Sequence, residues 1–116
     1  MLVVLGFYRR KPGLSHQEFS DYWTNVHGPM LRDHPDIAPH IKYYVQHHLE
    51  PNPSGDMRDI GFDGFSEAWY DSAEDRARVV QSAAFQAIRE DEAMFIDLTQ
   101  TRVSVIDTQR VIIDNR

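Results

Sequence analysis

The sequence predicts an α+β fold of the ferredoxin-like type, with one antiparallel sheet, helices on one of its faces, and the order βαββαβ. Four segments are rich in β-branched and aromatic residues, two regions carry apolar residues at helical spacing, and Gly- or Pro-containing stretches separate them. Their order along the chain is that of the split βαβ arrangement. With 116 residues we expect one domain, spanning residues 1–116.

The first strand and the first helix have the clearest signals. Residues 2–9, LVVLGFYR, predict a strand that ends in the turn RRKPG. Ser15 and Glu18 form the capping box SHQE, which predicts the start of a helix. Apolar residues then recur at helical spacing: Phe19, Tyr22, Trp23, Val26 and Met30. We expect Gly28 and Pro29 to end or kink this helix, because proline lacks an N–H and disfavours a helical residue before it.

The middle of the chain predicts two strands. Residues 33–40 form a proline-containing loop, and residues 41–49, IKYYVQHHL, predict the second strand. The polar, turn-rich residues 50–61 connect it to a third strand at residues 62–70. Alternation in the third strand puts three side chains on each face: Phe65, Glu67 and Trp69 on one, and Ser66, Ala68 and Tyr70 on the other.

The last third of the chain predicts helices followed by a strand. Ser72 with Asp75 resembles a second N-cap. Apolar residues follow in two helical pieces: Ala73, Ala77, Val80 and Ala84, then Phe85, Ile88, Met94 and Phe95. Residues 102–114 predict one or two final strands. Apolar side chains occur on both faces of the strands while helices cover only one, so we expect a homodimer that packs sheet on sheet.

The composition argues against several classes of function. A net charge of −6 argues against binding to nucleic acid or to an anionic membrane, because phosphate contacts need clustered Lys and Arg. The absence of cysteine excludes disulfides, thiol catalysis and cysteine metal sites. The N-terminus lacks the basic and long apolar regions of a signal peptide, and no apolar run approaches the ~20 residues of a membrane helix. We therefore expect a soluble, cytoplasmic protein.

Several motifs taken together resemble those of one family. The pattern KPGLS..EF..YW...HGP occupies residues 11–29, and DG..E.W occupies residues 63–69. YYVQHH, DEAMFID and RVIID extend the pattern, in order, over nearly the whole chain. The sequence thus resembles the EthD family within the dimeric α+β barrel superfamily. The resemblance implies a ferredoxin-like dimer with a pocket between the helices and the sheet of each subunit.

The resemblance also implies a type of reaction. The family is named after a protein linked to ether degradation, and related members include a lactone isomerase and fungal polyketide dehydratases or cyclases. We expect a cofactor-independent acid–base enzyme, of the isomerase, cyclase or dehydratase type, acting on a hydrophobic cyclic, aromatic or polyketide-like small molecule. The alternatives are a cofactor-free monooxygenase of the same superfamily and a non-catalytic small-molecule-binding or accessory protein of a degradation pathway. The absence of the cysteines used by lactone-isomerase relatives argues against that activity.

His27 is the leading candidate for the chemistry. It matches the histidine of the family's HGP motif and lies roughly 40° round the helix from Trp23, at the edge of the apolar stripe. A helix break at Gly28 would free its ring to reach a pocket. Because imidazole titrates near neutral pH, His27 suits a general base or acid that takes a proton next to a carbonyl. The alternative is a structural histidine that closes the end of the helix.

The second strand offers a tyrosine to the same pocket. Tyr43 and Tyr44 point to opposite faces, so one of them would line the pocket and stabilise an enolate through its O–H. Tyr44 shares its face with Gln46, and Tyr43 shares a more apolar face with Ile41 and Val45. The pattern leaves both tyrosines open, and aromatic packing is the alternative for each.

Two carboxylates complete the candidate site. Glu67 lies in mid-strand between aromatic residues, where burial would raise its pKa and let it return the proton; a salt bridge is the alternative. Asp91 either caps the last helical piece or orients His27. The residues expected to bind substrate are Tyr22, Trp23, Gln46, Trp69, Asp91 and Phe95. We predict no cofactor, and no metal site, because the six histidines lack metal-ligand spacing.

Overall fold

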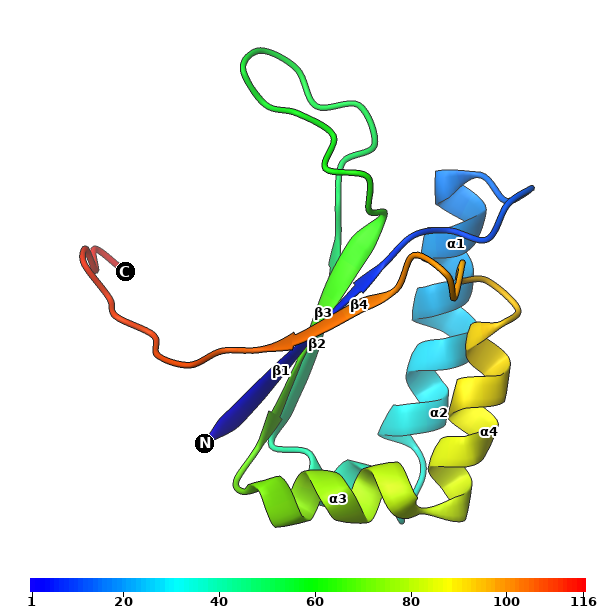
Figure 1. The fold of residues 1–116 in the computed structure, drawn as a ribbon, viewed down its shortest axis with the longest axis vertical. Helices are drawn as coiled ribbons and strands as arrows, with labels where there is room; N and C mark the ends of the chain where they lie inside the picture. The colour runs from blue at the N-terminus through cyan, green and yellow to red at the C-terminus, as the bar shows by residue number, and fades with distance from the viewer.

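One four-stranded antiparallel sheet, with all helices on one side of it, forms the architecture (Figure 1). The structure is a computed structural model and describes residues 1–116. The strands are β1 (Leu2–Tyr8), β2 (Tyr43–His48), β3 (Gly64–Tyr70) and β4 (Arg102–Val105). They lie in the order β2-β3-β1-β4, and the central pair runs from Leu2 opposite Tyr70 to Tyr8 opposite Gly64. The predicted ferredoxin-like α+β fold class is confirmed.

The first helical segment continues from His16 to Arg32. It comprises α1 (His16–Tyr22), a π-helical turn η1 (Trp23–His27) and α2 (Gly28–Arg32). The predicted capping box is present at its start. Of the two expected outcomes at Gly28 and Pro29, an end or a kink, the end does not occur, because the helix continues through the π-helical turn into α2. Gly28 donates its N–H to the Trp23 carbonyl five residues back, and Pro29 falls in the first turn of α2, where the absence of an N–H costs little.

The remaining helices are η2 (Ala38–His40), α3 (Ala73–Gln81) and α4 (Ala83–Glu92). Serine side chains cap the last two, because Ser72 Oγ accepts from the Asp75 N–H and Ser82 Oγ from the Phe85 N–H, both at 3.2 Å. No helix has the combination of length and apolar character needed to cross a membrane.

The C-terminal strand is shorter than the sequence predicts. Strand β4 ends at Val105, and Ile106 makes one more hydrogen bond, from its N–H to the Val3 carbonyl at 3.0 Å. Strand β1 begins at Leu2, so little backbone remains to pair with residues 107–114. These residues instead extend away from the sheet as an arm, drawn in red in Figure 1.

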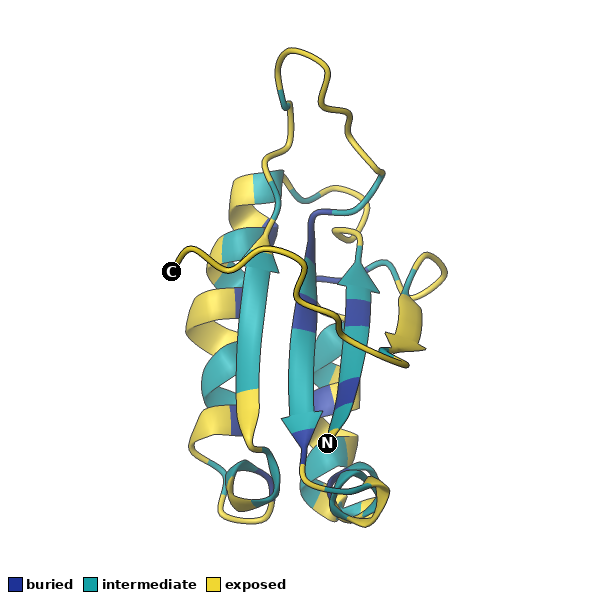
Figure 2. Cartoon of the chain, turned by 90° about the vertical axis from the view of Figure 1, so that its left-hand side faces the viewer, coloured by how far each residue is buried: buried dark blue, intermediate teal, exposed yellow.

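The core lies between the sheet and the helices in two clusters. One consists of Leu31, Ile37, Tyr70, Val79 and Ile88, and the other of Phe19, Trp23, Phe95 and Ile96. Gly64 allows the Trp23 ring to approach β3, since a Cβ there would lie 2.6 Å from the ring. The opposite face of the sheet has no helices over it, and its strands are mostly half-buried (Figure 2). We call this the open face.

Candidate active site

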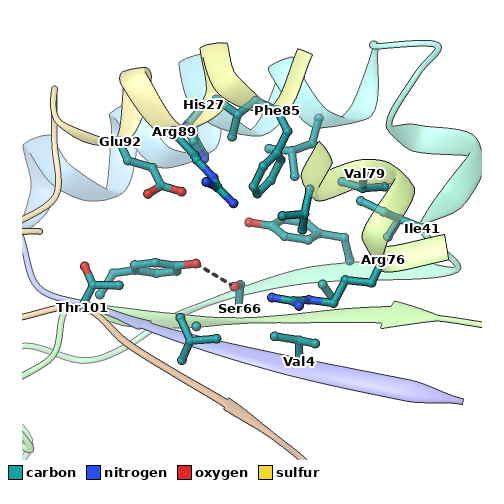
Figure 3. Close-up of a pocket in the computed structure, with 18 of the residues that line it drawn as sticks. Val4, His27, Ile41, Ser66, Arg76, Val79, Phe85, Arg89, Glu92 and Thr101 are labelled. Atoms are coloured by element: carbon teal, nitrogen blue, oxygen red, sulfur yellow. Dashed lines mark hydrogen bonds between the residues drawn. The ribbon is translucent and has the colours of Figure 1, made fainter. Parts of the chain in front are cut away.

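A cavity of about 380 Å³ separates the helices from the sheet (Figure 3). Its floor comes from the sheet, with Val4, Ser66 and Val103, and its roof from α3 and α4, with residues such as Val79 and Phe85. Of the 20 residues that line it, 13 are hydrophobic, so the cavity suits an apolar small molecule held by a few polar groups.

His27 lies on the wall of this cavity and forms a pair with Asp91. Its Nδ1 is 2.9 Å from Asp91 Oδ2, while the Tyr22 hydroxyl donates to Asp91 Oδ1 at 2.6 Å. Because an ionised carboxylate only accepts hydrogen bonds, the imidazole carries its proton on Nδ1. Asp91 lies near the end of α4 rather than at a helix N-terminus, so its position is that of a group orienting His27.

The other imidazole nitrogen is available to the cavity. His27 Nε2 makes no hydrogen bond within the chain. Every side-chain nitrogen or oxygen atom that is buried in this protein does have a hydrogen-bond partner, so Nε2 is not a buried atom. Nε2 therefore faces accessible space. Burial lowers the pKa of His27, and the Asp91 carboxylate opposes this only in part. A neutral imidazole with a free lone pair is the form a general base requires.

The π-helical turn brings His27 over the sheet. Four side chains at intervals of four residues are buried against the sheet side: Phe19, Trp23, His27 and Leu31. In a regular α-helix, side chains four residues apart differ in direction by roughly 40° around the helix axis. Over three such steps the last of the four side chains would point away from the sheet. The wider π-helical turn offsets this rotation. Gln46 on β2 supports the turn by donating from Nε2 to the Trp23 carbonyl at 3.0 Å.

Two tyrosine hydroxyls reach the cavity from the sheet. Tyr44 lines it, and burial raises the pKa of Tyr44, so its O–H remains a hydrogen-bond donor. Tyr8 lies 3.5 Å from Ser66 Oγ, and burial raises its pKa as well. The side chain of Tyr8 folds back over Gly6, where a Cβ would overlap the tyrosine hydroxyl.

Charged residues on the two C-terminal helices line the cavity and were missed by the sequence analysis. Arg76 lies on α3, and Arg89 and Glu92 lie on α4 (Figure 3). Burial raises the pKa of Glu92, and its carboxyl makes no hydrogen bond within the chain. Helical spacing offered a partial signal, since Arg89 and Glu92 are three residues apart and share a helix face.

Three predicted site residues lie on the open face instead. Glu67 is 2.6 Å from His47 Nε2 and also accepts from Trp69 Nε1 at 3.2 Å. Tyr43 is exposed and packs edge-on against Trp69, with ring centroids 5.8 Å apart. Of the two tyrosines left open by the sequence, Tyr44 and not Tyr43 lines the cavity, and the expectation that Glu67 and Trp69 share a pocket with His27 is wrong. Alternation assigned Glu67 and Trp69 correctly to one face, but it does not tell which face the helices cover.

Four other predicted substrate-binding residues lie outside the cavity and pack around the His27–Asp91 pair or the π-helical turn. Tyr22 holds Asp91, as described above, and Gln46 holds the π-helical turn at the edge of the sheet. Phe95 is fully buried, with its ring centroid 4.9 Å from that of His27, and Trp23 is buried in the same cluster. None of these four side chains lines the cavity.

Comparisons with known proteins identify the fold and the sequence family. A sequence model described as the EthD domain matches residues 11–99. The structure of an ethyl tert-butyl ether d (EthD) family protein from Bacillus halodurans C-125 is similar, with a TM-score of 0.69 at 18% identity over 94% of this chain and 100% of that chain. No curated protein matches the chain in sequence.

Two further solved structures share the fold. A dimeric protein of unknown function with a ferredoxin-like fold, from Bacteroides fragilis NCTC 9343, has a TM-score of 0.66 at 8% identity over 92% of this chain and 95% of its own. A hydroxynitrile lyase from Passiflora edulis has a TM-score of 0.63 at 17% identity over 95% of this chain and 96% of its own. These likenesses show the architecture alone.

Proposed function

This chain belongs to the EthD domain family, and we propose that it is an acid–base enzyme that acts, without a cofactor, on a hydrophobic cyclic or aromatic small molecule. The observation that carries the proposal is the His27–Asp91 pair, joined at 2.9 Å, with the second imidazole nitrogen free beside a largely apolar cavity. A buried carboxylate that fixes the tautomer of a histidine is a recurring arrangement for a general base.

The geometry supports a reaction that begins at a carbon next to a carbonyl group. His27 Nε2 takes a proton from this carbon, and the resulting enolate oxygen accepts a hydrogen bond from the Tyr44 hydroxyl. Glu92, whose raised pKa favours the protonated acid, then gives a proton to a leaving hydroxyl, which departs as water, or to another carbon of the enolate. Solvent returns the proton from the His27 imidazolium to Glu92. The net reaction is a dehydration or an isomerisation.

The same fold occurs in a hydroxynitrile lyase, so the architecture is compatible with elimination chemistry. A cofactor-free oxygenase and a non-catalytic binding protein use the same cavity differently. The oxygenase consumes dioxygen, whereas the binding protein releases its ligand unchanged.

A ligand screen with two matched histidine variants tests the proposal. Lactones, phenols, anthrones and short polyketide mimics are tested for a thermal upshift of the wild type, and each hit is incubated and its products read by mass spectrometry. We expect His27→Gln to bind the hit and to convert it about 10²–10⁴-fold more slowly. The control His34→Gln, in the loop before β2 and away from both the cavity lining and the open face, keeps the wild-type rate.

Each other result of the screen contradicts the proposal in a different way. Equal turnover by wild type and His27→Gln would show that His27 takes no part in the reaction. Dioxygen uptake with the hit indicates the oxygenase. A hit that all three proteins bind and none converts indicates the binding protein.

We also infer that the protein works as a homodimer packed sheet on sheet. The open face carries stacked aromatic rings, with Phe7 and Phe65 centroids 5.2 Å apart and His47 and Phe65 centroids 4.3 Å apart. A second copy would cover these rings, and the Bacteroides fragilis neighbour is described as dimeric. The C-terminal arm adds the exposed Val111, Ile112 and Ile113 to the surface available to a partner.

A further inference from the structure

Two arginine side chains line the apolar cavity, and the one acidic side chain beside them is Glu92, whose pKa burial raises and the Arg89 charge lowers in part. Arg76 and Arg89 both lie on its wall, and neither forms a salt bridge within the chain. Of the other eight arginines, four form salt bridges, as Arg10 does with Asp63 at 2.8 Å. The remaining four do not, and all of these are exposed and line no part of this cavity. Arg76 is half-buried and Arg89 is exposed, so water can solvate both guanidinium groups before a ligand binds. Their N–H donors on the cavity wall are then free to pair with an anionic ligand.

The cavity therefore differs in charge from the rest of the molecule. The chain as a whole carries a net charge of −6. The charged side chains on the cavity wall are two arginines and Glu92, and burial favours the uncharged form of that carboxyl. A positive region inside an acidic protein attracts anions to one place and repels them elsewhere.

Arg89, although exposed, also contacts an aromatic ring that lines the cavity. Its guanidinium lies over the Phe85 ring, with Cζ 4.9 Å from the ring centroid. Stacking of this kind occupies the face of the guanidinium plane and leaves its N–H edges free to donate. Arg76 extends into the cavity from the other helix, α3, so the two cations reach it from different elements (Figure 3).

We propose that the substrate of this site is a carboxylic acid, and that Arg76 and Arg89 bind its carboxylate while the apolar wall holds its ring. The planar, forked guanidinium matches a carboxylate through two parallel hydrogen bonds, which an uncharged ligand does not supply. This proposal rests on the proposed function, because it assumes that the substrate binds in the same cavity. It narrows the substrate class to cyclic or aromatic acids.

Calorimetric binding of 1-naphthoate and its uncharged counterpart 1-naphthamide tests this inference. The proteins are wild type, the double variant Arg76→Gln/Arg89→Gln, and Arg78→Gln, which removes the same kind of charge from the exposed side of α3. We expect wild type to bind naphthoate about tenfold or more tightly than naphthamide, as charge-assisted hydrogen bonds imply. The double variant loses this preference, and Arg78→Gln keeps it.

Several results would overturn the inference. The inference is wrong if the wild type binds naphthoate and naphthamide with equal affinity. It is also wrong if the double variant binds naphthoate as tightly as the wild type does, or if the wild type does not bind naphthoate at neutral pH. The single variants Arg76→Gln and Arg89→Gln provide the same comparison if the double variant does not fold. Binding by His27→Gln separates the two proposals, because a carboxylate preference retained without turnover leaves the arginine site standing while the proposed reaction fails.

Discussion

The two faces of the sheet carry the same kinds of side chain in opposite surroundings. On the helix-covered side, Tyr44 lies near the His27–Asp91 pair, and the His27 side chain is only 6% exposed. On the open face, Tyr43 packs against Trp69, which donates to Glu67 of the His47–Glu67 pair, and the His47 side chain is 38% exposed. Both pairs are within hydrogen-bonding distance, so the pairing does not distinguish them. The enclosing cavity distinguishes them, because it alone can exclude water and hold a small molecule beside the histidine.

The largest expected effect concerns assembly through the open face. Trp69→Lys places an ammonium group among the aromatic rings that a second copy would cover, and burying an unpaired charge costs several kcal/mol. We expect the dimer Kd to rise about a hundredfold or more, as measured by sedimentation equilibrium. The control Val26→Lys lies on an exposed part of η1 and leaves the Kd unchanged. A Trp69→Lys protein with the wild-type Kd would show that the open face has another role.

A smaller effect separates the two glutamates. Glu92→Gln keeps the shape of the side chain but removes the acidic proton, so we expect kcat on the substrate found in the screen to fall about ten- to a hundredfold. Glu67→Gln retains hydrogen-bonding atoms beside His47 and Trp69, and we expect it to keep the wild-type kcat. Equal losses in the two variants would mean that the acid is not in the cavity.

The smallest effect is the dependence of stability on pH. Burial lowers the pKa of His27 below its usual 6.5, so above that pH the residue is neutral in both the folded and the unfolded chain. As the pH falls below 6.5, the unfolded chain takes up the proton first, and the stability falls until the pH has passed below the folded pKa. We expect the Tm of the wild type to drop by a few degrees more than that of His27→Gln over this range. Parallel Tm curves for the two proteins would contradict the burial of a neutral His27.

Much of the fold follows from local signals. The capping box at Ser15 and Glu18 and the alternation in the strands predicted the elements and their order. The π-helical turn was missed because a proline after glycine signals a helix end, and a compensating change in helix geometry has no local signature. The end of β4 was missed because it is set by where β1 begins, which is a property of the pairing.

The site was predictable only in part. His27 and Asp91 were both singled out, and the structure brings them together although they are 64 residues apart. Glu67 and Trp69 were misplaced, and Tyr43 could not be told from Tyr44, because a two-residue period defines two faces without saying which one is covered. Glu92 and the two arginines lacked a sequence motif. Charged residues outside the apolar stripe of a helix are expected to face solvent, and these three line a cavity only because α3 and α4 span it.

The π-helical turn also affects how this chain is compared with others. A π-helical turn holds one residue more than the α-helical turn it replaces, which is what a single-residue insertion leaves in a helix. A homologous chain with a regular first helix would align with a one-residue gap within residues 23–27, and its cavity histidine would follow the tryptophan by three positions rather than four. Searches that fix the four-residue interval between Trp23 and His27 would therefore pass over such homologues, even where the same imidazole occupies the same place.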